Sequence, residues 1–371
     1  MPYKSLRVKQ QANIEVKKPR LFGFLAGLIL GFLLVFSVDK VFLKKQLPAS
    51  STQVLSLTDT DSSPAVNLKN LKTLGILLLG YGGEGHPGGY LTDAIQVVFI
   101  DFEKSRLHLI SVPRDLWVKF PGQSVGKINT TITMLSEDKD NRVLSGAKNM
   151  KNYLSQILGL NLDYFIGVDF VGFQRAIGLN LKGIEVEVGE TLDDPWYPVQ
   201  GLELETCGKT AGEVADLSKK YSGFELERQF PCRYEHLHFE KGTVLMQGGE
   251  ALKYARSRHG STAGDISRGI RQQEVLTAVR KKLLSLNVLP GLPDFFRDIV
   301  KHTVTDIDAD IVKYLLPAAG LAFDFQINRI NLSTDNVLST GNVGSAAVIM
   351  PKDGLHNYTG IQNFIQSQIR D

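Results

Sequence analysis

The sequence predicts a layered α/β or α+β fold, in which helices flank a mixed central sheet, preceded by one N-terminal transmembrane helix. Two observations predict the layered class. From residue 71 onward, apolar runs of strand length alternate with amphipathic runs of helix length, and elements that alternate in this way pack as layers. The composition, with 43% hydrophobic and 22% charged residues in 371, is that of a globular chain and excludes wholesale disorder.

The transmembrane helix is predicted from Leu21–Val38, which reads LFGFLAGLILGFLLVFSV and contains no charged residue. A spanning helix needs about 20 apolar residues, and residues 41–43 can extend the run to that length. Six Lys or Arg residues precede it within the first twenty, so the N-terminus is predicted to stay in the cytoplasm. A cleaved signal peptide is the alternative. The apolar run exceeds the usual core of about 7–15 residues, and no A-x-A site follows it, so an uncleaved anchor is favoured.

Four segments are predicted along the chain. They are a basic cytoplasmic tail (1–20), a single-pass membrane anchor (21–43), a stalk rich in Ser, Thr, Asp and Pro (44–70) and one extracytoplasmic domain (71–371). Residues 1–45 hold nine Lys or Arg and two acidic residues, so the rest of the chain is acidic although the net charge is +3. An acidic body argues against a nucleic-acid binder, whose affinity comes from neutralising phosphates.

The domain is predicted to begin with three strands. Leu74–Leu79 is a buried-strand candidate, and Ala94–Phe102 and Arg106–Val112 flank a short polar turn, which indicates a hairpin. Val143–Leu158 has apolar residues at helical spacing. The other predicted elements, in chain order, are a strand at Tyr164–Val168, a short helix at Phe170–Ile177, a strand at Gly183–Val188, a short helix at Glu250–Tyr254, a long amphipathic helix at Asp265–Leu286, a helix at Asp308–Ala318, a strand at Ile327–Asn331 and a closing helix at Asn357–Ile369.

A glycine-rich loop follows the first predicted strand. Residues 80–85, GYGGEG, match the pattern G-x-G-x-x-G, but a dinucleotide-binding loop of this kind must open a helix. Here residues 86–89, HPGG, stop a helix, and the next predicted element is a strand. A dinucleotide site is therefore excluded. The glycines could let backbone pass close to a ligand, supply positive φ angles or form a plain loop.

The chain has two cysteines, Cys207 and Cys232. Outside the cytoplasm they could pair and staple a surface excursion, and two unpaired thiols are the alternative. No C-x-x-C motif or Cys/His cluster with zinc spacing is present. His236 and His238 alternate in a way that suits a strand or an extended loop, and the sequence shows no third ligand beside them.

Three segments carry candidate functional residues. Residues 91–93, LTD, place a carboxylate at the entry to a strand, and residues 111–115, SVPRD, place an Arg–Asp pair after a strand's end. The third segment, 256–273, begins with RSRHG and contains several arginines. Arginines that converge suggest bidentate recognition of phosphate or carboxylate oxygens, and aspartates among them could hold Mg²⁺ or orient guanidinium groups. The alternative is a set of structural ion pairs.

The long helix in the third segment is predicted to carry a polar stripe. At 100° per residue, Asp265, Arg268 and Gln272 lie within about 60° of one another. The apolar residues Leu276, Val279 and Leu283 continue the same stripe. The polar start of the stripe is therefore predicted to face a cavity. The opposite face, with Glu274, Thr277 and Lys281, is predicted to be solvated.

At these residues the sequence resembles the LytR-CpsA-Psr family, membrane-anchored enzymes that move glycopolymers from polyprenyl-pyrophosphate carriers onto peptidoglycan. The matching pieces, in order, are ILLLG, TDAIQVVFID, LISVPRDLWV, KINTTI, DYFIGVDFVGF, KGIEVEV, DDPWYP, GGEALKYARSR, GDISRGIRQQ and MPKDG. Two positions depart from the family pattern: many members have an arginine where this chain has Leu91, and an aspartate where it has residues 81–83.

The resemblance implies a role for each matching residue. Asp93 would be a Mg²⁺ ligand, with Mg²⁺ as the cofactor. Lys127, with Asn129 beside it, would line the site, and Asp265 and Gln272 would be orienting or active-site residues. The residues that would bind pyrophosphate are Arg114, Lys127, Arg256, Arg258, Arg268 and Gln272, and those assigned to catalysis are Asp93, Arg114, Asp115, Asp265 and Arg268.

The reaction hypothesis is phosphoryl transfer. A sugar hydroxyl of peptidoglycan attacks the phosphorus that bears the lipid-linked polymer. The bond from that phosphorus to polyprenyl phosphate breaks, polyprenyl phosphate leaves and a phosphodiester forms, mainly through positioning and charge stabilisation. The hydroxyl proton would pass to Asp115 or Asp265, a choice left open. The segment YFIGVDFVGF could line a groove for the polyprenyl tail, but ordinary core is the favoured interpretation of its aromatic residues. A non-enzymatic, membrane-tethered binder of polymer or lipid phosphate and a lipid pyrophosphatase are the competing hypotheses.

Overall fold

The structure, a computed structural model, describes residues 71–86, 88–122, 124–138, 140–260, 265–283, 302–308, 311, 325–344 and 346–370. The tail, anchor and stalk predicted for residues 1–70 lie outside the described residues, as does most of the helix predicted at Asp308–Ala318. None of the helices in the described ranges combines the length and the apolar character that crossing a membrane requires.

A six-stranded mixed sheet forms the centre of the domain, as predicted, with strand order β11-β6-β1-β2-β3-β12. The central strand β1 is antiparallel to β2 and parallel to β6, and β3 is antiparallel to β2 and parallel to β12. The predicted hairpin is confirmed as β2–β3. The strands are β1 (Thr73–Tyr81), β2 (Thr92–Asp101), β3 (Arg106–Ser111), β6 (Tyr164–Asp169), β11 (Thr303–Thr305) and β12 (Gln326–Asn331).

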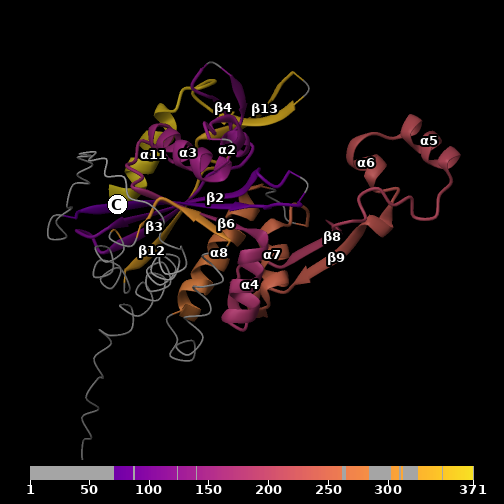
Figure 1. Cartoon of the computed structure of the whole chain (residues 1–371), viewed down its shortest axis with the longest axis horizontal. Helices are drawn as coiled ribbons and strands as arrows, with labels where there is room; N and C mark the ends of the chain where they lie inside the picture. The colour runs from indigo at the N-terminus through magenta and orange to yellow at the C-terminus, as the bar shows by residue number, and fades with distance from the viewer. Residues whose placement is uncertain are drawn as a thin grey trace, which may run out of the picture.

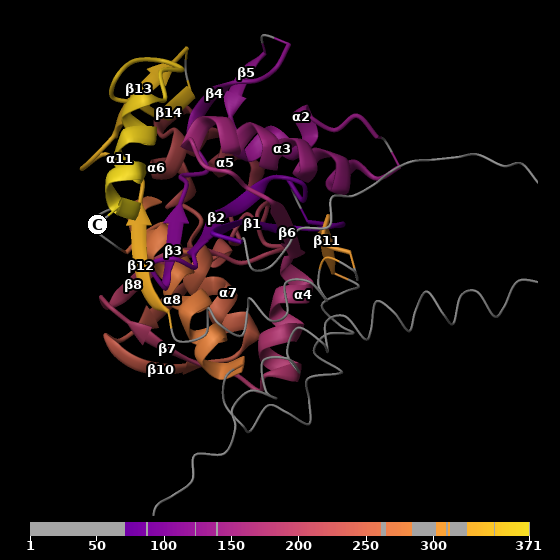
Figure 2. The ribbon, with the colours of Figure 1, turned by 90° about the vertical axis from the view of Figure 1, so that its left-hand side faces the viewer.

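Helices cover both faces of this sheet (Figures 1 and 2). On one face, α3 (Arg142–Leu158) and α11 (Thr359–Arg370) bury their apolar stripes against alternate residues of β1 and β2, with α2 (Thr131–Met134) beside them. Leu77 and Val97 point to this face, because side chains at every second position of a strand share one face. Burying this core supplies most of the free energy that holds the layers together.

The opposite face carries α4 (Phe170–Arg175), α7 (Gly248–Arg256) and α8 (Asp265–Leu283) (Figure 1). The short helix predicted at Phe170–Ile177 is split, because α4 passes into a π-helical stretch at Ala176–Asn180. A two-stranded sheet of β7 (Ile184–Val188) and β10 (Gly242–Met246) packs on the outer side of α8, in one core with α7. Two further hairpins are β4 (Trp117–Lys119) with β5 (Val125–Lys127), and β13 (Leu338–Val343) with β14 (Ala346–Pro351).

The prediction that Glu274 faces solvent is wrong. The residue is only 6% exposed, and its carboxylate accepts hydrogen bonds from the Tyr254 hydroxyl (2.6 Å) and the Gly189 backbone NH (3.1 Å). Burial, with this carboxylate beside it, raises the pKa of Tyr254. The prediction for Glu274 failed because elements distant in sequence pack against this side of α8. The β7–β10 sheet and α7 cover the side of α8 that the helical period alone leaves for solvent, whereas Lys281, near the helix end, is exposed as predicted.

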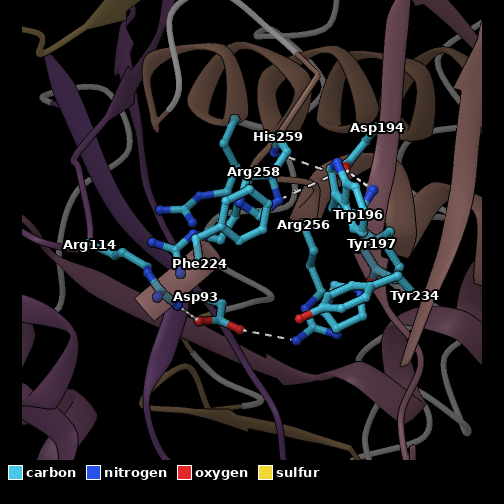
Figure 3. A pocket seen from close by; sticks show the side chains of 12 residues that line it. Asp93, Arg114, Asp194, Trp196, Tyr197, Phe224, Tyr234, Arg256, Arg258 and His259 are labelled. Atoms are coloured by element: carbon cyan, nitrogen blue, oxygen red, sulfur yellow. Dashed lines mark hydrogen bonds and ion pairs between the residues drawn. The ribbon is translucent and has the colours of Figure 1, made fainter. Parts of the chain in front are cut away.

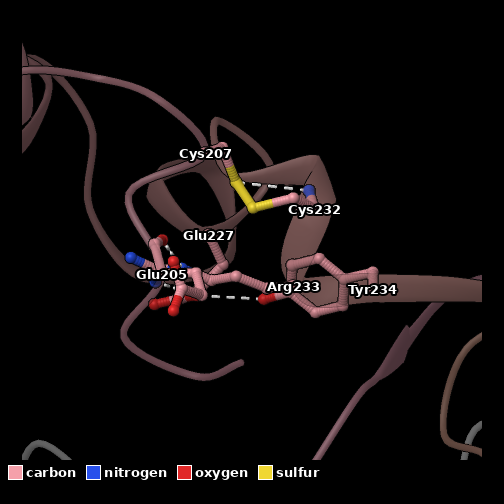
Figure 4. Close-up of a disulfide and its surroundings, with 6 residues drawn as sticks. All are labelled: Glu205, Cys207, Glu227, Cys232, Arg233 and Tyr234. Carbon is pink, nitrogen blue, oxygen red and sulfur yellow. Dashed lines mark hydrogen bonds and ion pairs between the residues drawn. A yellow bond between two sulfur atoms is a disulfide. The ribbon is translucent and has the colours of Figure 1, made fainter. Parts of the chain in front are cut away.

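An arm projects from the body (Figure 1). It consists of β8 (Leu192–Pro198) and β9 (Tyr234–Phe239), joined by an excursion that carries α5 (Ala211–Lys220) and α6 (Gly223–Glu227). The predicted pairing of the cysteines is confirmed: a disulfide joins Cys207 to Cys232 across the base of the excursion, with a Cα–Cα separation of 5.6 Å (Figure 4). The bond limits the conformations open to this loop and so fixes α5 and α6 relative to β9.

Candidate active site

A β-bulge positions Asp93. Along the β1–β2 pair, Gly80 opposes Ala94 and Tyr81 opposes Thr92, so Asp93 is the extra residue of the ladder. A bulge of this kind re-aims a side chain and is frequent beside functional sites. Here it turns the carboxylate of Asp93 toward the end of α7, where arginines from distant parts of the chain meet it (Figure 3).

Two arginines hold the two oxygens of the Asp93 carboxylate. Arg114, which follows β3, donates from Nη1 to Oδ1, and Nη2 of Arg256, the last residue of α7, lies 3.6 Å from Oδ2. The Arg256 guanidinium also sits over the ring of Phe170, 4.2 Å from its centroid. Each guanidinium keeps further N–H groups that an anion could take. The sequence prediction that these three segments converge is thus met in the geometry.

Asp115, the residue after Arg114, is a second carboxylate that several cations share. Lys127 Nζ lies 2.8 Å from its Oδ1, and Arg114 Nε and Arg258 Nη2 lie 3.8 and 4.0 Å from its Oδ2. Burial alone would raise the pKa of this carboxyl, but the hydrogen bond from Lys127 and the charges of Arg114, Lys127 and Arg258 lower the pKa below its ordinary value. A carboxylate held in this way stays ionised and is a weak proton acceptor. Its geometry suits it to positioning cations.

The lowered pKa of Asp115 predicts how its ion pairs depend on pH. The folded-state pKa of Asp115 is lowered, so its ion pairs are complete above the unfolded-state pKa near 3.8 and are lost only as the pH falls through the lower folded-state value. Lys127 and Arg258 lose their anchor in Asp115→Asn. The variant is therefore expected to raise KM for the diphosphate substrate that the family resemblance implies by about tenfold or more, while the acid limb of the kcat profile between pH 5 and 8 is unchanged. Steady-state kinetics across that range check it. A loss of kcat with an unaltered KM would instead assign Asp115 the role of base.

The other predicted residues lie on α8. Arg268 is 5% exposed and lines the same cavity as Asp93. Gln272 is 9% exposed; its amide donates to the backbone oxygen of Asp93 (3.3 Å) and accepts from Gln96 Nε2 (2.9 Å). Gln272 therefore braces the bulge. Helix α8 begins at Asp265, whose side chain lies outside the described residues, so its role as an alternative base stays a prediction.

A buried polar layer that sequence reasoning missed holds the arginine segment in place. Arg271, 5% exposed, donates from Nε to the backbone oxygen of Tyr254 (2.9 Å) and from Nη2 to that of Ser257. Asp194, with no exposed surface, accepts from the Ser257 hydroxyl (2.6 Å). These bonds fix the chain on either side of Arg256. The signal was present in the sequence, since Asp194 belongs to the matched piece DDPWYP.

The cavity beside Asp93 has a volume of about 310 Å³ and two unlike walls (Figure 3). Arginines 114, 256, 258 and 268 form one wall. The other is aromatic: it consists of Trp196, Tyr197, Phe224 and Tyr234 from the arm, and Phe224 stacks on His259 with ring centroids 4.8 Å apart. The aromatic wall was not predicted, because Phe224 reaches the site only through the fold of the disulfide-closed excursion.

An apolar pocket of about 250 Å³ opens on the other side of Asp93. The segment YFIGVDFVGF, for which ordinary core was the favoured interpretation, contributes Ile166, Val168, Phe170 and Phe173 to the lining of this pocket, while Phe165 is core. Leu78 of β1 and Leu252 of α7 line it too. Asp93 and Arg256 border both this pocket and the arginine-lined cavity. The charged centre therefore lies between an apolar space and an aromatic one.

The glycine-rich loop folds back on itself. The Gly83 NH donates to the Gly89 oxygen (2.9 Å), Gly83 has a φ of 86°, and a Cβ on Gly89 would lie 2.0 Å from the Gly83 oxygen. A Cβ on Gly82 would lie 2.9 Å from the ring of His86. Gly83, Gly85 and Gly88 all have positive φ angles. Of the three interpretations of the glycines, the structure therefore supports positive φ angles.

The residues present fit a magnesium ion only in company with a phosphate ligand. Mg²⁺ is held in such sites by one or two carboxylates together with substrate phosphates and water. Asp93 offers one carboxylate, already facing two guanidinium groups. In the described ranges, no set of three metal-ligating side chains includes Asp93. A diphosphate that drew the arginines to its own oxygens would free Asp93 for the ion.

The chain is similar to several known proteins. It is 28% identical over 227 residues to the regulatory protein MsrR of Staphylococcus aureus strain Mu50, a match that covers 61% of this chain and 54% of MsrR, so the chain matches only about half of that relative's length. It is 22% identical over 329 residues to TagU of Enterococcus faecalis strain V583, a polyisoprenyl-teichoic acid–peptidoglycan teichoic acid transferase, covering 88% of this chain and 89% of TagU.

The fold also matches solved structures. The crystal structure of protein gbs0355 from Streptococcus agalactiae superposes with a TM-score of 0.56 at 20% identity, over 82% of this chain and 90% of that protein. At that identity the likeness shows a shared fold and nothing more. The sequence model of the LytR_cpsA_psr family matches residues 41–361. The chain belongs to the LytR_cpsA_psr family.

Proposed function

We propose that this protein transfers a glycopolymer from a polyprenyl-pyrophosphate carrier to a sugar hydroxyl of peptidoglycan, forming a phosphodiester. One observation carries the proposal: Asp93 and Arg256 border both the apolar pocket and the arginine- and aromatic-lined cavity. A lipid-linked diphosphate has this order of chemistry, with a hydrocarbon chain, two phosphates and then sugars. Membership of the family and the likeness to TagU, a teichoic acid transferase, support a transferase.

In this proposal each wall has one task. The apolar pocket takes the first isoprene units of the carrier, which gain free energy by leaving water. The arginines bind the diphosphate oxygens and stabilise the charge that moves onto the leaving polyprenyl phosphate as its P–O bond breaks. The aromatic wall packs against the apolar faces of the first sugars, as rigid aromatic rings with polar tips do at binding surfaces. The attacking sugar hydroxyl enters from the cavity and forms the new P–O bond. Its proton passes to Asp265, the sequence candidate for the base that remains when Asp115 positions cations.

Magnesium belongs to the proposal as the cofactor, held by Asp93 together with the diphosphate. It would neutralise charge on the phosphate oxygens. Because the described residues alone offer it a single carboxylate, we expect Mg²⁺ and the diphosphate to bind with positive coupling. Calorimetry should show a prenyl diphosphate binding at least tenfold more tightly with millimolar Mg²⁺ than with EDTA. Equal affinity in the two buffers would remove the metal from the proposal.

The membrane arrangement is also proposed. The predicted anchor would hold the domain on the outer surface with its N-terminus in the cytoplasm, where lipid-linked polymer and peptidoglycan are both within reach. A single-pass arrangement of this kind suits a pocket that must accept a polyprenyl chain from the bilayer.

Release of polyprenyl phosphate, measured with and without a peptidoglycan acceptor, tests the function. Acceptor-dependent release is expected for the transferase. Release without an acceptor would indicate a lipid pyrophosphatase, and no release under either condition would indicate a binder. The matched control is the Arg268→Ala variant, which is expected to lose release in both enzymatic cases because Arg268 lines the cavity beside Asp93.

A further inference from the structure

A cluster of side chains that could hold a metal ion lies on the arm, in the described part of the chain and separate from Asp93. His236 and His238 stand on β9 and Asp193 stands on β8, and one ligand atom from each lies within 4.8 Å of the other two. The sequence showed the two histidines without a third ligand. The pairing register supplies it, because Asp193 lies directly across the ladder from His238.

The contacts define the donor atoms. Asp193 Oδ1 lies 2.5 Å from His236 Nε2 and 3.0 Å from His238 Nδ1. Two imidazole nitrogens and one carboxylate oxygen, with a fourth position open, form a set that tetrahedral Zn²⁺ takes in proteins. Ligand atoms around such an ion stand about 3.3 Å apart, given bonds of about 2.0–2.2 Å. To make room for an ion, the Asp193 carboxylate must therefore move away from the two ring nitrogens by less than about 1 Å. Its side chain is 57% exposed and has space for this movement.

An independent feature is the partner of the second nitrogen of His238. Metal-ligating histidines generally donate their other ring N–H to a carboxylate, which fixes the ring and raises its basicity. His238 Nε2 lies 2.9 Å from Glu240 Oε1, and the Thr191 hydroxyl in turn donates to Glu240 Oε2 (3.2 Å). His238 is thereby oriented with Nδ1 toward Asp193 and His236.

We infer that His236, His238 and Asp193 form a binding site for a divalent transition-metal ion, Zn²⁺ in the first place, with Glu240 as the carboxylate that orients His238. Imidazole ligands select ions such as Zn²⁺ over Mg²⁺, so this site and the proposed Mg²⁺ position take different ions.

The ion would stabilise the strands that support the arginine segment. Asp194, the next residue along β8, accepts a hydrogen bond from the Ser257 hydroxyl, and Gly260 packs so closely on β8 that a Cβ there would lie 2.0 Å from the backbone oxygen of Asp193. An ion at Asp193 would clamp the two strands where they support the arginine segment.

The test uses the full-length chain in detergent, purified without a polyhistidine tag and stripped of metal. Titration with ZnCl₂ against a chromogenic zinc chelator is expected to give one ion per chain, with micromolar or tighter affinity that millimolar MgCl₂ leaves unchanged. The His236→Ala/His238→Ala double variant is expected to lose this binding, and Glu240→Gln is expected to weaken it by about 10- to 100-fold. His356→Asn, at a histidine outside the cluster, is the matched control and should bind as the unmodified protein does.

X-ray absorption at the zinc edge gives a second readout that does not depend on the variants folding well. It is expected to show a coordination shell of nitrogen and oxygen that contains two imidazoles. The assignment is overturned if the unmodified chain takes up no zinc, if the double variant binds as tightly as the unmodified chain, if MgCl₂ displaces the ion, or if fewer than two imidazoles coordinate it.

Discussion

Arg256→Ala is expected to lower kcat/KM for acceptor-dependent release of polyprenyl phosphate by about 10²–10³-fold, the range seen when one donor is removed from a preorganised anion site. Arg256 faces the Asp93 carboxylate, is braced over Phe170 and borders both the lipid-sized pocket and the cavity. Its loss removes positive charge at the point where charge develops on the leaving phosphate. Steady-state kinetics with a prenyl-diphosphate-linked glycan measure the effect.

Two further variants sharpen that experiment. Arg256→Lys keeps the charge but loses the planar fork and the stacking on Phe170, so an activity between those of the alanine variant and the unmodified enzyme is expected. Arg142→Ala is the matched control: Arg142 is an exposed arginine on α3, on the far side of the sheet, and activity within twofold of the unmodified enzyme is expected. Full activity of Arg256→Ala would show that Arg256 does not stabilise the diphosphate during transfer.

Arg271→Met is expected to lower the free energy of unfolding by about 3–5 kcal/mol, the cost of breaking a buried charge network by removing one partner. The guanidinium donates to the backbone oxygens of Tyr254 and Ser257, and burial lowers its pKa. Methionine fills similar space but leaves those buried oxygens without a donor and Glu274 without a nearby cation. Thermal unfolding followed by circular dichroism should show a midpoint lower by about 5–8 °C.

Lys281→Met on the same helix is the control for that variant. Lys281 is 62% exposed and faces Glu185 and Glu187, which are equally exposed, so its ion pairs contribute less than about 1 kcal/mol. An Arg271→Met protein as stable as the Lys281→Met protein would contradict the assignment of Arg271 as the brace of the arginine segment.

The hydrophobic pattern of the sequence predicted the elements whose structure depends on neighbouring residues. The β2–β3 hairpin follows from two apolar runs around a polar turn, and α8 follows from its helical period. Residue type singled out the three segments that carry Asp93, Arg114 and Arg256, and the family resemblance implied that they share one site; the structure brings them together. The bulge that aims Asp93 was not foreseen, because it depends on how β2 registers against β1.

The predictions that failed, or were not made, depend on contacts between distant segments. Glu274 is buried because the β7–β10 sheet, built from residues far away in sequence, covers its side of α8. Phe224 reaches the cavity through an excursion closed by a disulfide. Asp193 stands across from His238 through the register of β8 on β9. A helical or strand period contains no information about any of these pairings.

The proposed function requires one diphosphate to bind beside Asp93, between the apolar pocket and the aromatic cavity. A crystal structure of the protein with a prenyl diphosphate and Mg²⁺ would show where it binds. We expect the diphosphate oxygens within hydrogen-bond distance of Arg114 and Arg256, and the prenyl chain against Phe170 and Phe173. A diphosphate bound elsewhere on the domain, with Asp93 still held by both arginines, would rule this binding mode out.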